Sequence, residues 1–242
     1  LQAILGAAEL SRSRQSLFRS MLGSLWALAH EGTGSGDLKI ADAALAEMTE
    51  AFRVFRPYRD VHKVTMFGSA RTRPDDAVYV LARDVARQLA TSGWMVVTGA
   101  GPGIMAAGTE GAGRDRSFGV NIRLPGEEGT NPFIAQDPKL VEMRYFFTRK
   151  LMLMKESHGY AVLPGGFGTL DECYELLTLL QTGKAVPAPV VLVETRAGTY
   201  WHAWREFLDE HAVRPGYVSE DDLVLFRVCL LYTSDAADDL TR

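Results

Sequence analysis

Three glycine-rich segments contain the residues best suited to binding a phosphate group. They read FGSAR at 67–71, TGAGPG at 98–103 and LPGGFGT at 163–169. Glycine lets backbone N–H groups approach a phosphate closely, and the start of a following helix adds a partial positive charge. Each segment alone is a weak signal, because tight turns also use glycine for steric reasons. If all three follow strands of one parallel sheet, they converge at one edge, which predicts a single phosphorylated ligand there.

Ionisable residues accompany the third segment. Thr169 is a suitable helix N-cap whose hydroxyl could also reach a phosphate oxygen, and Asp171 and Glu172 would occupy the first turn of that helix. Acids at such positions also serve simply to complement the helix dipole. Upstream, Arg149 and Lys150 would lie on a helix, where a basic pair is usually a solvated face. The second segment imitates a dinucleotide fingerprint but follows the second strand, so NAD binding is not expected.

Together these motifs resemble the LONELY GUY (LOG) family of nucleoside-monophosphate phosphoribohydrolases. The family signature is an Arg-Lys pair followed by PGGxGTxxE, and this chain has FFTRK at 146–150 and PGGFGTLDE at 164–172. The resemblance extends from about residue 63 to residue 228 and is nearer to the longer bacterial type. Members are often labelled lysine decarboxylases. The chain shows no recognisable lysine context for pyridoxal phosphate, so that activity is not expected.

The resemblance implies a role for individual residues. Arg149 and Glu172 would be the catalytic pair. The acidic or amide side chain that the family often has after its third strand would be Glu128 or Asn131. The resemblance and the glycine segments together predict the substrate-binding residues Gly68, Ser69, Gly101, Gly103, Asn131, Lys150, Gly165, Gly166, Phe167, Gly168, Thr169 and Thr178.

The chemistry of N-glycoside cleavage agrees with this assignment. Breaking the bond passes through an oxocarbenium-like ribosyl cation, which a carboxylate such as Glu172 can stabilise while it orients the attacking water. Arg149 can hold phosphate or ribose oxygens in a fixed fork. The expected products are a free purine or cytokinin base and ribose 5-phosphate. The alternative is a non-catalytic nucleotide or molybdenum-cofactor carrier of the same fold, against which the presence of both Arg149 and Glu172 argues.

No metal or cofactor is expected. The five histidines, at 30, 62, 158, 202 and 211, show no spacing typical of metal ligands. Cys173 follows Glu172, but a single cysteine beside a helix start is more often a buried small apolar residue than a nucleophile.

Short apolar runs alternate with helical patterns from residue 61 onward, which predicts an α/β fold with a Rossmann-like, doubly wound parallel sheet. Strands are predicted at 63–67, 94–98, 117–122, 160–163 and 190–193. Helices are predicted at 75–91, 103–114, 139–157, 169–181 and 200–211.

Three regions are predicted along the chain. Residues 1–60 form an N-terminal helical extension. One helix is predicted over 3–30 and, after a Gly/Ser link, a second helix capped by Asp37 is predicted to run to about residue 55. Residues 61–229 form the nucleotide-binding catalytic domain. Residues 230–242 (LLYTSDAADDLTR) resemble a translated sequencing adapter and are interpreted as a non-native tail.

Composition limits the classes of partner. The 242 residues have a net charge of −4, which argues against a nucleic-acid backbone as main partner. Two cysteines fit a reducing compartment, which favours the cytoplasm, and no apolar run is long enough to predict a membrane span.

The predicted helix 139–157 has more apolar surface than one sheet face needs. A homodimer or higher homo-oligomer is therefore expected.

Overall fold

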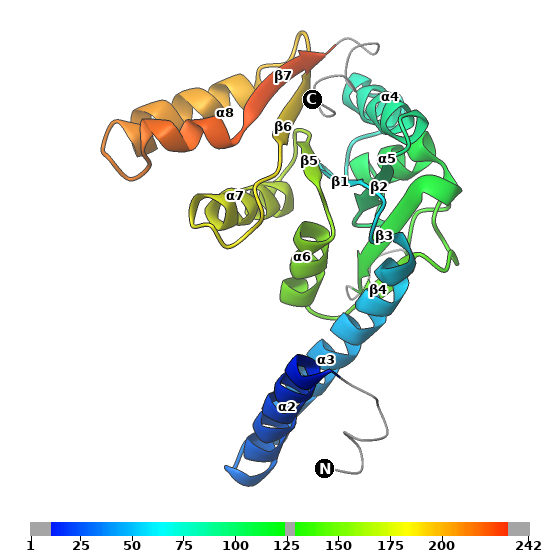
Figure 1. The fold of residues 1–242 in the computed structure, drawn as a ribbon. Coiled ribbons are helices and arrows are strands. Elements are labelled where there is room, and N and C mark those ends of the chain that lie inside the picture. Colours follow the sequence, from blue (N-terminus) through cyan, green and yellow to red (C-terminus); the bar gives the residue numbers. More distant parts are fainter. Residues whose placement is uncertain (1–10, 124–128, 232–242) are drawn as a thin grey trace. The chain divides into compact units, whose positions relative to one another are not determined.

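Seven parallel strands form one sheet in a computed structural model, which describes residues 11–123 and 129–231 (Figure 1). The strands are β1 (Lys63–Phe67), β2 (Met95–Thr98), β3 (Ser117–Ile122), β4 (Leu140–Met143), β5 (Gly159–Val162), β6 (Val190–Thr195) and β7 (Arg227–Leu231). They lie in the order β4-β3-β2-β1-β5-β6-β7. Every residue of β1, β2 and β5 is buried, as expected for strands covered on both faces.

Helices cover both faces of this sheet. One face packs against α4 (Ala77–Thr91) and α5 (Ile104–Ala112), with a core that includes Met66, Leu81 and Val85. The other face packs against α6 (Phe146–Lys155), α7 (Phe167–Gln181) and α8 (Tyr200–Leu208). Four short helical segments, Arg56–Tyr58, Arg114–Arg116, Asp209–Val213 and Glu220–Leu225, complete the connections. The predicted Rossmann-like, doubly wound fold is confirmed.

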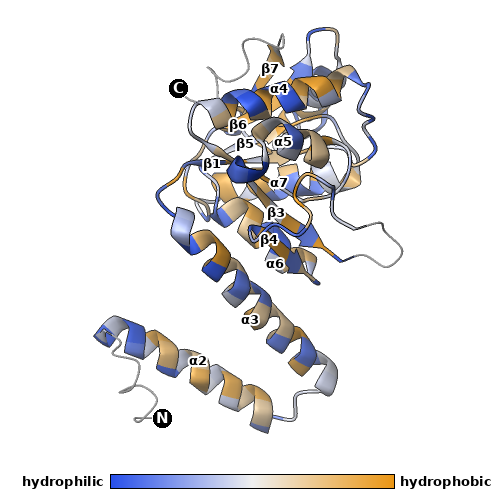
Figure 2. Cartoon of the chain, turned by 90° about the vertical axis from the view of Figure 1, so that its right-hand side faces the viewer, coloured by the Kyte–Doolittle hydropathy of each residue, from blue (hydrophilic) through white to orange (hydrophobic). Residues whose placement is uncertain are grey.

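The chain divides into two compact units, with the division between Ala46 and Glu47. The first unit contains α2 (Arg12–His30) and the beginning of α3 (Ser35–Phe55). Hydrophilic and hydrophobic residues alternate along both helices (Figure 2). The second helix was predicted to be capped by Asp37, but it begins at Ser35, so Asp37 lies in its first turn and complements the helix dipole.

The prediction of one helix over 139–157 is wrong in its first part. Leu140–Met143 is strand β4, and α6 begins only at Phe146. Val141 and Met143 are buried while Glu142 between them is exposed, a period of two that is typical of a strand. Pairing with β3, for example Gly119 with Leu140, overrides the helical propensity of this short run.

Strand β7 has no counterpart among the predicted strands. It pairs with β6 through Leu230 and Leu231, the first two residues of the segment interpreted as a non-native tail. The strand lies at the edge of the sheet, where one neighbour rather than the local sequence decides the pairing. The rest of that segment, 232–242, lies outside the described residues.

Candidate functional site

The three glycine-rich segments meet at the carboxyl ends of β1, β2 and β5. The strand order reverses between β1 and β5, which is where open α/β sheets bind ligands. Ser69 N donates a hydrogen bond to Pro164 O at 3.2 Å, and Ile104 N donates to Ser69 O at 3.0 Å. The first segment is therefore bonded directly to the third segment and to the first residue of α5, which follows the second segment.

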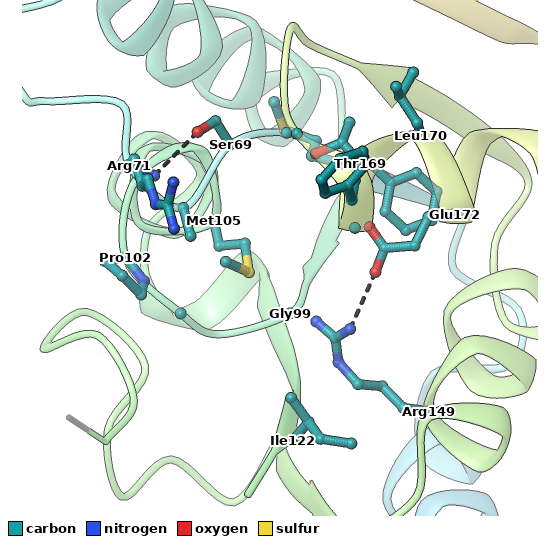
Figure 3. Close-up of a pocket in the computed structure, with 18 of the residues that line it drawn as sticks. Ser69, Arg71, Gly99, Pro102, Met105, Ile122, Arg149, Thr169, Leu170 and Glu172 are labelled. Atoms are coloured by element: carbon teal, nitrogen blue, oxygen red, sulfur yellow. Dashed lines mark hydrogen bonds and ion pairs between the residues drawn. The ribbon is translucent and has the colours of Figure 1, made fainter. Parts of the chain in front are cut away.

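A cavity of about 930 Å³ opens between these segments (Figure 3). It contains nine of the residues predicted for the site. These are Gly68, Ser69, Gly101, Arg149, Gly166, Phe167, Gly168, Thr169 and Glu172. Further lining residues, absent from the predicted set, are Met66, Phe67, Ala70, Arg71, Gly99, Pro102, Met105, Asn121, Ile122, Phe146 and Leu170.

Arg149 of α6 and Glu172 of α7 form an ion pair in the wall of this cavity. Arg149 Nη1 lies 3.0 Å from Glu172 Oε1, and both side chains are largely buried, with 8% and 13% exposed. Arg149 Nε donates to Val120 O at 2.9 Å, which fixes the guanidinium against the end of β3. The sequence placed these residues 23 positions apart, and the packing of α6 beside α7 brings them together.

Burial and charge act in opposite directions on Glu172. Desolvation has the larger effect and raises the pKa of the Glu172 carboxyl, while the neighbouring Arg149 guanidinium lowers it by a smaller amount. Such a carboxylate is poised to respond to a developing positive charge, because little water screens it.

Gly99 leaves room for the Arg149 guanidinium. A Cβ atom built on Gly99 would lie 2.0 Å from Arg149 Nη2 and 2.6 Å from Met105 Sδ. Any side chain here would displace the catalytic candidate Arg149. No local pattern separates Gly99 from the other glycines of its segment, because the contact comes from a side chain 50 residues later in the chain.

Apart from Gly101, where a Cβ would lie 2.7 Å from Met105 Cε, the glycines of the predicted site fall into two groups. Gly68, Gly103 and Gly165 are packing glycines, since a Cβ would lie 2.6 Å from Ile104, 2.2 Å from Ser69 O and 2.2 Å from Thr169 Oγ1, respectively. At Gly166 and Gly168 a Cβ would meet no protein atom within 4 Å. Packing therefore does not explain these two glycines, whereas close approach of a ligand to their backbone would.

The third glycine-rich segment (163–169), called the glycine loop below, is held in place by the start of α8. Tyr200 Oη donates to Gly165 O at 2.7 Å. Glu194, at the end of β6, accepts hydrogen bonds from Tyr200 N at 2.7 Å and Trp201 N at 3.0 Å, and so fixes the start of α8. These bonds tie the carbonyl of Gly165 to the start of α8.

Thr169 does not act as the predicted N-cap. Helix α7 begins at Phe167 with Gly166 as its N-cap, because Leu170 N already bonds to Gly166 O at 3.0 Å. Thr169 is thus in the first turn and buried, and Asp171 and Glu172 are in the second turn rather than the first.

Five predicted residues do not line the cavity. Gly103 and Gly165 are the packing glycines described above. Lys150 Nζ pairs with Asp171 at 3.0 Å and with Glu175, and so links α6 to α7. Thr178 is exposed on α7, and its hydroxyl donates to Tyr174 O at 2.7 Å.

The fifth, Asn131, holds the loop after β2. Its Nδ2 donates to Ala100 O at 3.0 Å and Gly101 O at 3.1 Å, and its Oδ1 accepts from Thr109 and from Phe133 N. Glu128, the alternative to Asn131, lies outside the described residues.

Comparison with known families decides the relationship of the chain. A family model described as "Possible lysine decarboxylase" matches residues 102–238, more than half of the chain. The chain belongs to this family, the LOG family. The predicted family assignment is confirmed.

Curated LOG relatives are distant. The pyrimidine/purine nucleotide 5'-monophosphate nucleosidase of Escherichia coli K12 is 29% identical over 158 residues, covering 60% of this chain and 35% of the relative. The cytokinin riboside 5'-monophosphate phosphoribohydrolase LOG1 of Arabidopsis thaliana is 37% identical over 71 residues, covering 29% of this chain and 32% of the relative. The chain thus spans about a third of the length of the curated relatives it matches.

A solved structure agrees in fold alone. The molybdenum cofactor carrier protein of Chlamydomonas reinhardtii superposes with a TM-score of 0.51 at 20% identity, covering 75% of this chain and 96% of that protein.

Residues 11–123 and 129–231 lack both a metal-binding cluster and a membrane-spanning helix. There, no three His, Cys, Asp or Glu side chains form a group that could hold a metal ion. No helix in the same ranges is long and apolar enough to cross a membrane.

Proposed function

We propose that this protein hydrolyses the N-glycosidic bond of a purine or cytokinin nucleoside 5'-monophosphate, giving free base and ribose 5-phosphate. The observation that supports this most directly is the largely buried Arg149–Glu172 pair, whose charged atoms lie 3.0 Å apart in the wall of the cavity. The same cavity is lined by Gly166 and Gly168, at which a Cβ would meet no protein atom within 4 Å. The names of the curated relatives describe this class of reaction.

In the proposed mechanism the backbone N–H groups of Gly166 and Gly168 bind the 5'-phosphate at the start of α7. The ribose then extends toward Glu172, in the next turn of the same helix. As the C1'–N bond breaks, its electron pair leaves with the base, and the Glu172 carboxylate stabilises the positive charge on the sugar. A water adds its hydroxyl to C1', and the base takes up a proton.

Arg149 has two functions in this proposal. Its charge opposes the effect of burial on Glu172 and so keeps more of the carboxylate ionised. Its bond to Val120 O holds the guanidinium rigid, so that it orients Glu172 toward the sugar.

The decarboxylase description does not fit the residues of the cavity. A pyridoxal-phosphate enzyme needs a lysine to hold the cofactor as a Schiff base. Among the described lining residues there is no lysine, and Lys150 next to Arg149 is engaged with Asp171 and Glu175.

The test is release of free base. The protein is incubated with AMP and with isopentenyladenosine monophosphate, and adenine or the cytokinin base is measured by chromatography, with adenosine as the control substrate. We expect base from the monophosphates. A carrier protein would instead bind the nucleotide without releasing base, which would refute the proposal. The relative rates for the two monophosphates decide the preferred base.

A further inference from the structure

We propose that Arg71 binds the phosphate of the substrate and thereby selects nucleotides over nucleosides. The ligand class rests on the proposed function. Arg71 is the last residue of the first glycine-rich segment, and the family motif assigns it no function.

Arg71 is placed beside the glycine loop. It follows β1, is exposed and lines the cavity. Ser69, two residues earlier, donates to Pro164 O, and a Cβ on Gly165 would lie 3.0 Å from Ser69 N. The turn carrying Arg71 is therefore in contact with the loop that we expect to hold the phosphate. In Figure 3, Arg71 lies near Pro102 and Met105, across the cavity from Glu172.

The charges of the cavity leave Arg71 uncompensated. The charged residues among the described lining residues are Arg71, Arg149 and Glu172. Arg149 and Glu172 neutralise each other, and Arg149 Nε is used by Val120 O. Within residues 11–123 and 129–231, no ion pair or hydrogen bond engages the Arg71 guanidinium, and only the backbone N of Arg71 donates, to Ser69 Oγ. The cavity thus retains one positive charge.

A phosphate monoester needs such a charge. It carries nearly two negative charges at neutral pH, whereas the start of a helix supplies only about half of one positive charge. A guanidinium presents paired N–H groups that match two phosphate oxygens. Arg71 supplies the charge that the glycine loop lacks, on a long side chain at the mouth of the cavity.

A matched control lies two residues away. Arg73 is also exposed, but it pairs with Asp75 at 3.3 Å and does not line the cavity. Arg71→Met and Arg73→Met remove the same charge from the same turn, so a difference between them reports on the position within the cavity. Both residues are exposed, so both variants should retain the melting temperature of the parent.

The experiment measures affinity by titration calorimetry. AMP and adenosine are titrated in a Glu172→Gln background, in which we expect hydrolysis to be slow, and ribose 5-phosphate is titrated into the otherwise unmodified protein. We expect Arg71→Met to weaken binding of AMP and ribose 5-phosphate by about 10- to 100-fold and to leave adenosine unchanged. Arg71→Lys should recover part of the loss, and Arg73→Met should bind all three ligands like its parent.

Two results would overturn the proposal. AMP affinity that survives Arg71→Met would show that the phosphate does not contact this residue. An equal loss for AMP and adenosine would place Arg71 at the base or ribose instead. Base release by the unmodified protein is a separate measurement. A protein that binds AMP through Arg71 without releasing base would refute the proposed function and leave this inference standing.

Discussion

Glu172 is the residue on which the proposed chemistry depends most. Its carboxylate is largely buried, faces Arg149 and lines the cavity, so its charge acts on a bound sugar with little screening. An amide at this position would keep an acceptor for Arg149 but lose the charge.

We therefore predict that Glu172→Gln lowers turnover of AMP by about 100- to 1000-fold, roughly 3 to 4 kcal/mol of barrier. AMP affinity should change little, because the phosphate is bound elsewhere. Steady-state rates and calorimetry measure the two effects. Glu210→Gln, at an exposed site on the same chain, is the control and should have normal turnover. Normal turnover by Glu172→Gln would remove this carboxylate from the mechanism.

The pH dependence of activity follows from the same burial. Because burial raises the pKa of the Glu172 carboxyl, the protonated form persists to higher pH than in a free glutamate. The carboxylate is the active form, so kcat/KM should fall as pH decreases through this raised pKa. We predict an acidic limb above the ordinary glutamate pKa of about 4.3. A profile that stays flat down to that pH would show that no raised carboxyl controls the rate.

Gly99 offers a test of Arg149 that leaves both charges in place. Its missing Cβ would lie 2.0 Å from Arg149 Nη2, so Gly99→Ala must push the guanidinium away from its position. A displacement of about 1 Å in a preorganised site commonly costs about 100-fold in rate, and we predict a loss of that order in kcat. Gly23→Ala, where a Cβ would meet nothing within 4 Å, is the control. Equal rates for the two variants would show that the Arg149 position is not critical.

At the scale of elements, the connections between strands and helices give the cavity its shape. The loop after β2 depends on Asn131, whose buried amide satisfies the carbonyls of Ala100 and Gly101. The family resemblance predicts substrate binding for Asn131, whereas its amide has four protein partners in the structure.

We predict that Asn131→Ala lowers the free energy of unfolding by about 1 to 3 kcal/mol, because it leaves buried backbone groups without partners. Urea unfolding measures this effect. Removal of the exposed Thr178 hydroxyl by Thr178→Val tests another predicted polar residue outside the cavity and should change stability much less. Unchanged stability of Asn131→Ala with a raised KM for AMP would restore the substrate-binding role.

At the scale of the whole molecule, the remaining expectation is that copies of the chain associate. Helix α6 exposes Phe146, Phe147 and Leu151, with 52%, 53% and 44% of each residue accessible. Large apolar residues grouped in this way are typical of surfaces that associate. Phe146 also lines the cavity, so association on this face would bring a second copy close to the site.

We predict a homodimer or larger homo-oligomer at micromolar concentration, measured by light scattering. Phe147→Asp should shift the distribution toward monomer, because it places a charge on this apolar face. Phe207→Asp, at a residue 55% exposed on α8, controls for a charge introduced elsewhere. A clean monomer of the unmodified protein would contradict the expectation.

The sequence by itself determined the fold class and nine of the residues that line the cavity. Glycine segments after apolar runs specify strand–turn–helix units, and parallel strands bring their carboxyl ends to one edge whatever the details of packing. The family motif in turn indicated Arg149 and Glu172 through their spacing to PGGFGT. Both the glycine segments and the motif are patterns of residues close together in the sequence, so they can be recognised without the tertiary structure.

Only the tertiary structure decided which of these residues line the cavity. Lys150 and Asn131 have the chemistry of ligand-binding residues but are occupied by partners on α7 and in the loop after β2. Gly99 looks like any turn glycine until Arg149 approaches it from α6. Strand β4 resembles a helix until β3 supplies its hydrogen bonds. In each case the deciding contact comes from a residue distant in the sequence, so no pattern within the segment itself could reveal it.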